Sequence, residues 1–203
     1  MKSEMERIPL RERNRLRIEK SIVNAAFELF SAAGYDQTTM DDIAEKAEIS
    51  RGTLFNYFPT KETLLIPFSK EMYQKRIQPE VISYLDTQPT TIQALRFLFM
   101  SIHKHILTLP QIDRALKQEF SHHKPTRKET LNSIGFLDNL INILHYGQQR
   151  GEVRTDIPVE KLARYLGVLY VSSLFHNVVE QVTSTDYTTE VDTLLAFMST
   201  ALH

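Results

Sequence analysis

The chain has no cysteine among its 203 residues. This excludes disulfide bonds, thiolate catalysis and zinc sites with cysteine ligands. No stretch approaches the ~18 consecutive apolar residues that a membrane span needs, and no continuous apolar segment follows the charged N-terminus as it would in a signal peptide. We therefore expect a soluble protein that stays in the cytoplasm and does not associate with a membrane.

The formal net charge of −1 argues against non-specific binding to nucleic acid through bulk charge. Charge is nevertheless concentrated near the N-terminus, where six cations between Arg7 and Lys20 face only Glu12 and Glu19, which leaves +4. A basic arm of this kind can lie on phosphates or enter a minor groove. The alternative is a solvated helix start, since a pair such as Arg15 with Glu19 is ordinary surface chemistry.

Apolar residues recur at helical spacing along the chain, without strand-like alternation, and this predicts an all-α fold. The first helix is expected over about residues 13–33, with Gly34 in the position of a C-cap glycine. We expect an N-terminal domain of residues 1–65 and a second domain of residues 66–203. Later helices are expected over about residues 91–107, 110–122, 127–150, 159–183 and 188–202.

Residues 39–58 have the pattern of a helix-turn-helix. Thr39 is a good N-cap for a short helix that buries Ile43, and Ser50 is a good N-cap for a second short helix. The second helix has an apolar side and an outward side that carries short polar groups and one arginine, Arg51. Such a helix is suited to a DNA major groove.

The run Ser50-Arg51-Gly52-Thr53-Leu54-Phe55-Asn56-Tyr57-Phe58, followed by Lys61-Glu62 and Leu64-Leu65, resembles the signature of the tetracycline-repressor (TetR) family of bacterial transcription regulators. The resemblance covers the first third of the chain, and residues 150–156 are weakly similar to the loop before that family's dimerising helices. It implies a three-helix DNA-binding domain joined to a larger helical domain for ligand binding and dimerisation. The implied function is a repressor that binds double-stranded operator DNA, palindromic in sequence, as a homodimer and is released by a small apolar or amphipathic effector.

Eight residues are predicted to contact the DNA. Arg51 can bond a guanine edge or a phosphate, and Thr53 and Asn56 are shorter readers of base edges. Gly52 would let the backbone approach closely. The full set is Thr39, Ser50, Arg51, Gly52, Thr53, Asn56, Tyr57 and Lys61. The resemblance implies that Thr39, Tyr57 and Lys61 contact phosphates. For Tyr57 the alternative is a surface aromatic residue packed on the first helix.

The second domain has no motif that indicates catalysis, such as GxGxxG or a P-loop. His103 and His105 point to different helix faces, and His122 and His123 would need further ligands from distant segments to hold a metal. We therefore expect no enzyme activity, no cofactor and no metal. The alternative is a helical enzyme or small-molecule carrier with a fortuitous helix-turn-helix.

Aromatic, methionine and histidine side chains of the second domain are candidates to line an apolar effector cavity with a few polar groups. Ordinary core packing is the alternative for each of them. The candidates are Phe68, Met72, Phe97, Met100, His103, Phe136, Tyr170 and Phe175.

The last helix has a clean apolar stripe, and the helix before it combines apolar with small residues. Together they suggest half of a four-helix dimer interface, while the alternative is that both complete the monomer core. The resemblance favours the dimer. The candidate interface residues are Leu162, Leu166, Val191, Leu194, Leu195 and Met198.

Pro67 falls inside the helix that Thr60 is expected to cap, and its missing amide predicts a kink. An apolar ligand beyond such a kink could swing the DNA-binding domain, which makes Pro67 a candidate hinge. The alternative is a tolerated kink without a regulatory role.

Overall fold

The computed structural model describes residues 9–107, 111, 135–179 and 187–202, and the side chains of these except residues 107 and 174–179. The described residues form helices, turns and loops without a β-strand, which confirms the all-α prediction. The chain divides into two compact units, Met1–Glu71 and Met72–His203, each of which is described by itself. The division falls six residues beyond the domain boundary expected from the sequence.

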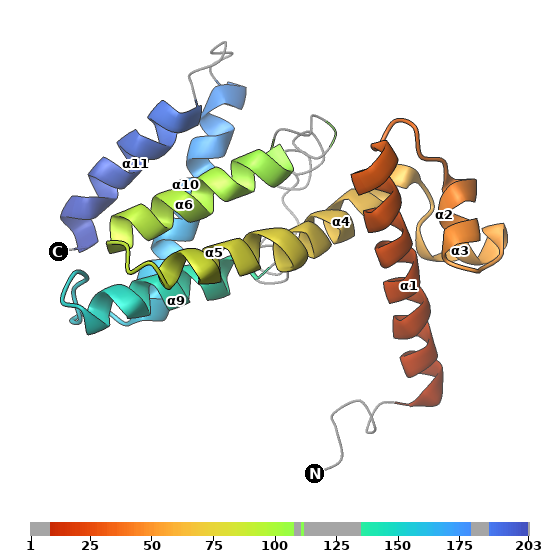
Figure 1. The fold of residues 1–203 in the computed structure, drawn as a ribbon, viewed down its shortest axis with the longest axis horizontal. Coiled ribbons are helices and arrows are strands. Elements are labelled where there is room, and N and C mark those ends of the chain that lie inside the picture. The colour runs from red at the N-terminus through yellow and green to blue at the C-terminus, as the bar shows by residue number, and fades with distance from the viewer. Residues whose placement is uncertain (1–8, 108–110, 112–134, 180–186, 203) are drawn as a thin grey trace. The chain divides into compact units, whose positions relative to one another are not determined.

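The first unit contains α1 (Leu10–Ala33), α2 (Met40–Lys46), α3 (Arg51–Tyr57), the 3₁₀ turn η2 (Lys61–Leu64) and α4 (Leu65–Met72) up to Glu71 (Figure 1). Helix α1 begins slightly earlier than expected, and Gly34 follows it with a positive φ of 87°. The core of the unit draws residues from every helix. Its buried side chains include Ile22, Ala26, Phe27, Phe30, Ile43, Leu54, Phe58, Leu64, Leu65 and Phe68.

Phe68 belongs to this core. Its ring lies 5.8 Å from the ring centroid of Phe27 and 5.4 Å from that of Phe30. The prediction that Phe68 lines an effector cavity in the second domain is therefore corrected. The helical spacing identified a buried aromatic residue correctly, but spacing does not say which core buries it.

Pro67 is the third residue of α4, where the first N–H groups of a helix need no partner within that helix. Thr60 precedes a 3₁₀ turn instead of a long α-helix, and its side chain forms no capping hydrogen bond. The wider π turn η3 (Tyr73–Ile77) comes just before Pro79 in the first turn of the next helix. A π turn relieves the clash of a proline ring with the carbonyl four residues back. Pro67 therefore lies in the first turn of α4 and does not interrupt a continuous α-helix, while its role as a hinge stays a prediction.

The second unit contains α5 (Gln78–Leu85), α6 (Thr91–Ile102), the π turn η4 (His103–Leu107), α9 (Phe136–Gln149), α10 (Val159–Val179) and α11 (Tyr187–Leu202). Helix α6 contacts α5, α9 and α11, and α10 packs against α9 and α11 (Figure 1). The helix expected over residues 110–122, the start of the helix expected over 127–150 and the pair His122 and His123 lie outside the described residues. Within the described part of the chain, no helix is long and apolar enough to cross a bilayer.

The loop after α9 joins the ends of three helices. The carboxylate of Glu152 accepts hydrogen bonds from the amide of Thr91 at 2.7 Å and from its hydroxyl at 2.8 Å, at the first residue of α6. The amide of Arg154 donates to the carbonyl of Leu202 at the end of α11 at 2.7 Å. A Cβ at Gly147 would lie 2.2 Å from the Thr91 hydroxyl oxygen, so only glycine fits under this contact.

The apolar stripe of α11 faces the core of the second unit. Val191, Leu194, Leu195 and Met198 are buried within the single chain, as are Leu162 and Leu166 of α10. These residues complete the monomer core, so the prediction that they form a dimer interface is wrong. Helix α11 packs on α6 and α10, and that packing already removes the stripe from water.

Candidate nucleic-acid interface

Helix α2 is fixed at its start by a reciprocal capping box. The hydroxyl oxygen of Thr39 accepts from the Asp42 amide at 3.1 Å, and the Asp42 carboxylate accepts from the Thr39 amide at 2.7 Å and from its hydroxyl at 2.8 Å. The hydrogen bonds that Asp42 accepts from Thr39 lower the pKa of its exposed carboxylate. The bond from the Thr39 amide has the larger effect, and the bond from its hydroxyl the smaller one. Both donors of Thr39 are thus engaged, so a phosphate contact would require its hydroxyl to leave Asp42.

The turn between α2 and α3 places the second helix. Glu48 adopts the left-handed conformation with φ of 56°, and the amide of Ile49 donates to the carbonyl of Ala44 at 3.0 Å. Ser50 then caps α3 by accepting from the Thr53 amide at 3.1 Å, and the two hydroxyl oxygens lie 2.8 Å apart. Both predicted N-caps, Thr39 and Ser50, are confirmed.

Helix α3 buries Leu54 and turns its polar side outward. Arg51, Gly52 and Asn56 are exposed, whereas Thr53 and Tyr57 are half-buried. A Cβ at Gly52 would meet nothing within 4 Å, so packing does not require glycine there. Close approach of a partner remains a reason for it, and base contact by these side chains stays a prediction.

Arg51 is held by contacts that are easily exchanged. Its Nη1 lies 3.2 Å from Oδ2 of Asp41, and its guanidinium lies 5.4 Å from the ring centroid of Phe55. The side chains of Arg51 and Asp41 are 68% and 61% exposed, and exposed ion pairs contribute only about 0–1 kcal/mol. A base edge or a phosphate can therefore replace Asp41 at low cost.

Lys61 of η2 is engaged within its own unit. Its Nζ donates to the carbonyls of Tyr35 at 2.8 Å and Thr38 at 3.0 Å, and lies 4.1 Å from the Tyr35 ring centroid. The Tyr35 hydroxyl donates to Glu62 at 3.3 Å. Burial, followed by the charge of Glu62, raises the pKa of Tyr35 to about 12. Sequence reasoning missed these contacts because they join residues 23 to 27 positions apart.

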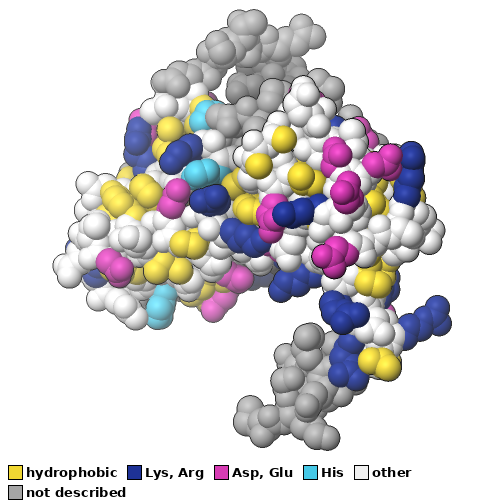
Figure 2. Space-filling view, turned by 45° about the vertical axis from the view of Figure 1, so that its right-hand side comes forward, with side chains coloured by type: hydrophobic (Ala, Val, Ile, Leu, Met, Phe, Trp, Pro, Cys, Tyr) yellow, Lys and Arg dark blue, Asp and Glu magenta, His cyan; other side chains and the backbone are white. Residues whose placement is uncertain are grey.

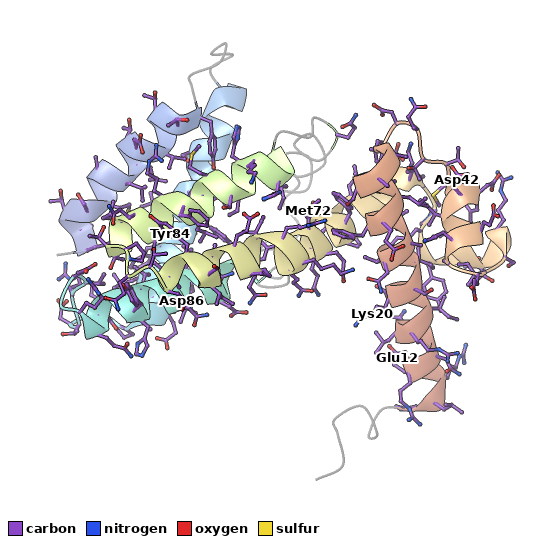
Figure 3. All side chains as sticks on the ribbon, viewed as in Figure 1. Glu12, Lys20, Asp42, Met72, Tyr84 and Asp86 are labelled. Carbon is purple, nitrogen blue, oxygen red and sulfur yellow. The ribbon has the colours of Figure 1, made fainter. Side chains whose placement is uncertain are left out.

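The basic segment at the N-terminal end of α1 is helical. None of residues 10–20 is buried, and five cations face two acids there, Glu12 and Glu19. Figure 2 shows Lys and Arg side chains around this end of the helix, and Figure 3 labels Glu12 and Lys20 on it. An α-helix is about 10–12 Å across and a minor groove is about 6 Å wide, so this segment does not fit a minor groove as folded. The folded segment can lie on phosphates, while entry into a minor groove would be by its arginine side chains and not by the helix itself. Both uses stay predictions.

The second unit gathers several of the predicted effector residues into one buried aromatic cluster. The rings of Phe99 and Tyr170 stack at 4.1 Å, and Phe136 lies 5.4 Å from Tyr170. The hydroxyl oxygens of Tyr170 and Tyr187 lie 2.7 Å apart, and Tyr187 donates to the carbonyl of Phe99 at 3.0 Å. His103 stacks on Tyr187 at 3.9 Å. Burial raises the pKa of both tyrosines well above 10, so both hydroxyls are neutral.

The remaining predicted effector residues lie elsewhere. Phe97 is half-buried and stacks at 4.2 Å on Tyr84 of α5, which Figure 3 labels. Met72 at the end of α4 and Met100 of α6 are also half-buried. The side chain of Phe175 lies outside the described residues.

Asn139 and Phe99 are among the core residues that sequence reasoning missed. Asn139 donates to the hydroxyl of Tyr73 at 2.7 Å, with both side chains buried. Phe99, at the centre of the aromatic cluster, had a usable signal because it lies on the apolar side of α6. No sequence pattern indicated that Asn139 is buried, because its hydrogen-bond partner Tyr73 is 66 positions away. Within the described part of the chain, no group of three His, Asp or Glu side chains is placed to hold a metal.

The fold and the outward side of α3 define a helix-turn-helix DNA-binding protein with a second, helical unit. The family model of bacterial regulatory proteins, tetR family, matches residues 22–66. The chain belongs to this family, whose members are transcriptional regulators and not enzymes. The alternative of an enzyme or carrier with a fortuitous helix-turn-helix is therefore wrong.

Relatives of the chain extend the likeness beyond the first unit. The uncharacterized HTH-type transcriptional regulator YuxN of Bacillus subtilis is 30% identical over 64% of this chain, which spans only 46% of YuxN. The fatty acid metabolism regulator protein of B. subtilis is 28% identical over 71% of this chain and 75% of that protein. The Thermus thermophilus repressor FadR, solved in complex with lauroyl-CoA, has a TM-score of 0.67 and 26% identity over 89% of this chain and 92% of its own.

Proposed function

We propose that the protein is a repressor that binds a palindromic operator in the cytoplasm as a homodimer and is released by a small amphipathic effector. The observation that carries the proposal is the exposed polar side of α3, set by two capped helices within the segment that matches the family model. Each α3 enters a major groove, with half-site centres about 34 Å apart or somewhat more. Sequencing the DNA that the purified protein retains at moderate salt identifies the operator; retention without sequence preference contradicts the proposal.

Replacing Arg51 with alanine is expected to weaken operator binding by about 1–3 kcal/mol and to relax the preference at one base pair per half-site. The reason is loss of a bidentate contact from the one long donor of α3. Binding to the operator and to its single-base-pair variants, followed by fluorescence anisotropy, measures the effect. Asp41→Asn is the control, because it frees Arg51 without removing it and should keep the preference. An Arg51→Ala protein that loses affinity equally for all sequences would show that Arg51 contacts phosphates only.

We also propose an outer face as the dimer interface, consisting of exposed apolar residues on α10 and α11. Tyr165 is 52% exposed, Val168 59% and Phe197 65%, and Leu169 is exposed as well. The two helices pack on each other, so two copies related by a two-fold axis would form a four-helix interface. The exposed apolar side chains replace the buried stripe as the surface that a second copy covers.

The first effector class to test is a long-chain fatty acyl-CoA. The support comes from the lauroyl-CoA complex of T. thermophilus FadR and the fatty acid metabolism regulator of B. subtilis. The cluster of Phe99, Phe136 and Tyr170 would contact the acyl chain. Since the rings of Phe99 and Tyr170 touch, a chain entering between them must separate them, which is the kind of change that couples ligand binding to conformation.

Adding lauroyl-CoA is expected to lower operator affinity about 5- to 150-fold, the usual range of allosteric coupling. By linkage, operator DNA must weaken lauroyl-CoA binding by the same factor. Both affinities are measured by titration with the other ligand absent and at saturation. Coenzyme A alone and sodium laurate are the controls for the two ends of the molecule. An unchanged operator affinity in saturating lauroyl-CoA rules out this effector class and leaves DNA recognition standing.

A further inference from the structure

Three tyrosine hydroxyls at the aromatic cluster of the second unit differ in where their hydrogens go. Tyr187 donates its one hydrogen to the carbonyl of Phe99 at 3.0 Å. The Tyr170 hydroxyl lies 2.7 Å from that of Tyr187, so Tyr170 must be the donor in this second bond. The hydrogens of both hydroxyls are therefore used inside the protein, and neither is left for a ligand.

The third hydroxyl, that of Tyr73 in η3, has an uncommitted hydrogen. It accepts a hydrogen bond from the amide nitrogen of Asn139 at 2.7 Å, and this bond does not use the hydrogen of Tyr73. Among the residues that the structure describes, none accepts that hydrogen. The Tyr73 side chain is fully buried, where a donor without an acceptor is unfavourable. Burial also raises the pKa of Tyr73 above its usual range, so the hydroxyl keeps its hydrogen.

Tyr73 adjoins the cluster that is proposed to contact the acyl chain. A Cβ on Gly135 would lie 3.5 Å from Cε1 of Tyr73, and Gly135 directly precedes Phe136. The ring of Phe136 lies 5.4 Å from that of Tyr170. Burial raises the pKa of Tyr170 most, followed by Tyr187 and then by the neighbouring phenol of Tyr73. The uncommitted donor therefore belongs to the same buried region as the predicted effector residues.

We infer that the Tyr73 hydroxyl donates a hydrogen bond to a carbonyl of the effector, which in an acyl-CoA is the thioester carbonyl. The inference rests on the proposed effector class. In the acyl part of lauroyl-CoA only this carbonyl forms hydrogen bonds, and it only accepts, so a hydroxyl with a free hydrogen is its complement. The amide of Asn139 favours this role, because it occupies an acceptor site of the Tyr73 oxygen and leaves the hydrogen available.

Two matched ligands test this contact: lauroyl-CoA and dodecyl-CoA, the thioether in which a methylene group replaces the carbonyl. Isothermal titration calorimetry gives the affinity of the DNA-free protein for each. Wild type is expected to bind lauroyl-CoA about 2- to 12-fold more tightly, the usual range for one hydrogen bond. Tyr73→Phe is expected to bind lauroyl-CoA at least about 5-fold more weakly than wild type, because the buried carbonyl loses its donor. Its affinity for dodecyl-CoA should stay within about twofold of wild type, since that ligand never formed the bond.

Three control variants separate the carbonyl contact from general damage to the core. Asn139→Leu removes the internal bond but leaves the Tyr73 hydroxyl, so it should still prefer lauroyl-CoA. Tyr170→Phe removes a hydroxyl whose hydrogen is already used, so it should affect both ligands alike and keep their ratio. The double variant of Tyr73→Phe and Asn139→Leu leaves no buried amide without a partner, and replacing both partners by apolar groups can be nearly neutral for folding. It should show no preference, which keeps the test decisive if Tyr73→Phe alone folds poorly.

Two results would overturn the inference: equal affinity of wild type for the two ligands, or a preference for lauroyl-CoA that survives in both Tyr73→Phe and the double variant. The first shows that the carbonyl has no donor in the complex, and the second assigns the donor to another residue. Both leave the proposed effector class standing, because the ligands still bind. A wild-type protein that binds neither ligand contradicts the effector class itself, and the inference falls with it.

Discussion

Phe197→Lys is expected to convert the dimer into a folded monomer and to weaken operator binding at least about 100-fold. The Phe197 side chain is 65% exposed in the single chain, so a lysine is tolerated there when the chain is alone. In the proposed dimer the same ammonium would be buried without a partner, which is strongly unfavourable. Binding then falls because two linked DNA-binding units exceed one by about 10²–10⁴ in affinity. Light scattering gives the mass, and operator titration gives the affinity.

Two variants calibrate this result. Phe197→Met keeps an apolar side chain and should remain a dimer. Ile82→Lys places the same charge at another exposed apolar residue, 54% exposed and on α5, outside the outer face of α10 and α11. It should also remain a dimer with wild-type affinity. A Phe197→Lys protein that stays dimeric at micromolar concentration would place the interface elsewhere.

The helix-turn-helix could be predicted from the sequence because its determinants are local. Thr39 and Ser50 lie next to the helices that they cap, and Pro59 follows α3 closely, so neighbouring residues decide the boundaries. The polar side of α3 follows from the same short periodicity. What the sequence could not supply is the state of each polar group. Residue spacing does not show that Arg51 pairs with Asp41. Nor does it show that Asp42 engages both hydrogen-bond donors of Thr39.

The dimer interface was misassigned for a physical reason. An apolar stripe at helical spacing shows that a helix face is buried, but not whether the covering surface belongs to the same chain. The cleanest stripe, with Leu195 and Met198, is the one packed inside the monomer. The exposed residue Phe197 lies on another side of α11, and the exposed Val168 lies on α10. Apolar periodicity does not single out either of them. The residues that a second copy could contact can be identified only when the structure shows which apolar residues the single chain leaves exposed.

The effector residues show the same limit. His103, Phe136 and Tyr170 do come together, because apolar spacing on three helices directs them toward one core. Phe97 is not part of that cluster, because it lies two residues from Phe99 on α6 and therefore on another side of the helix. Its stacking on Tyr84 depends on where α5 runs. Sequence spacing thus predicted membership of a core more reliably than membership of a cavity.

Leu195→Lys is expected to destabilise the second unit by more than about 4 kcal/mol, a large part of the 5–15 kcal/mol that holds a typical domain folded. The Leu195 side chain is 2% exposed within the single chain. Truncating a buried leucine lowers the free energy of unfolding by about 2–5 kcal/mol. A lysine at this position also places a charge without a partner in the core formed by α6, α10 and α11. The variant should aggregate or lose cooperative unfolding. Urea denaturation followed by circular dichroism and light scattering measures both.

The pair Leu195→Lys and Phe197→Lys distinguishes the core of α11 from its outer face. Both introduce one lysine on the same helix two residues apart, so the change in net charge is matched. Leu195→Met, which preserves volume, should lose less than about 1.5 kcal/mol and remain a dimer. If Leu195→Lys gave a soluble monomer of wild-type stability while Phe197→Lys stayed dimeric, the buried stripe would be the interface after all. An unfolded Leu195→Lys beside a folded, monomeric Phe197→Lys assigns the stripe to the core and the outer face to the second copy.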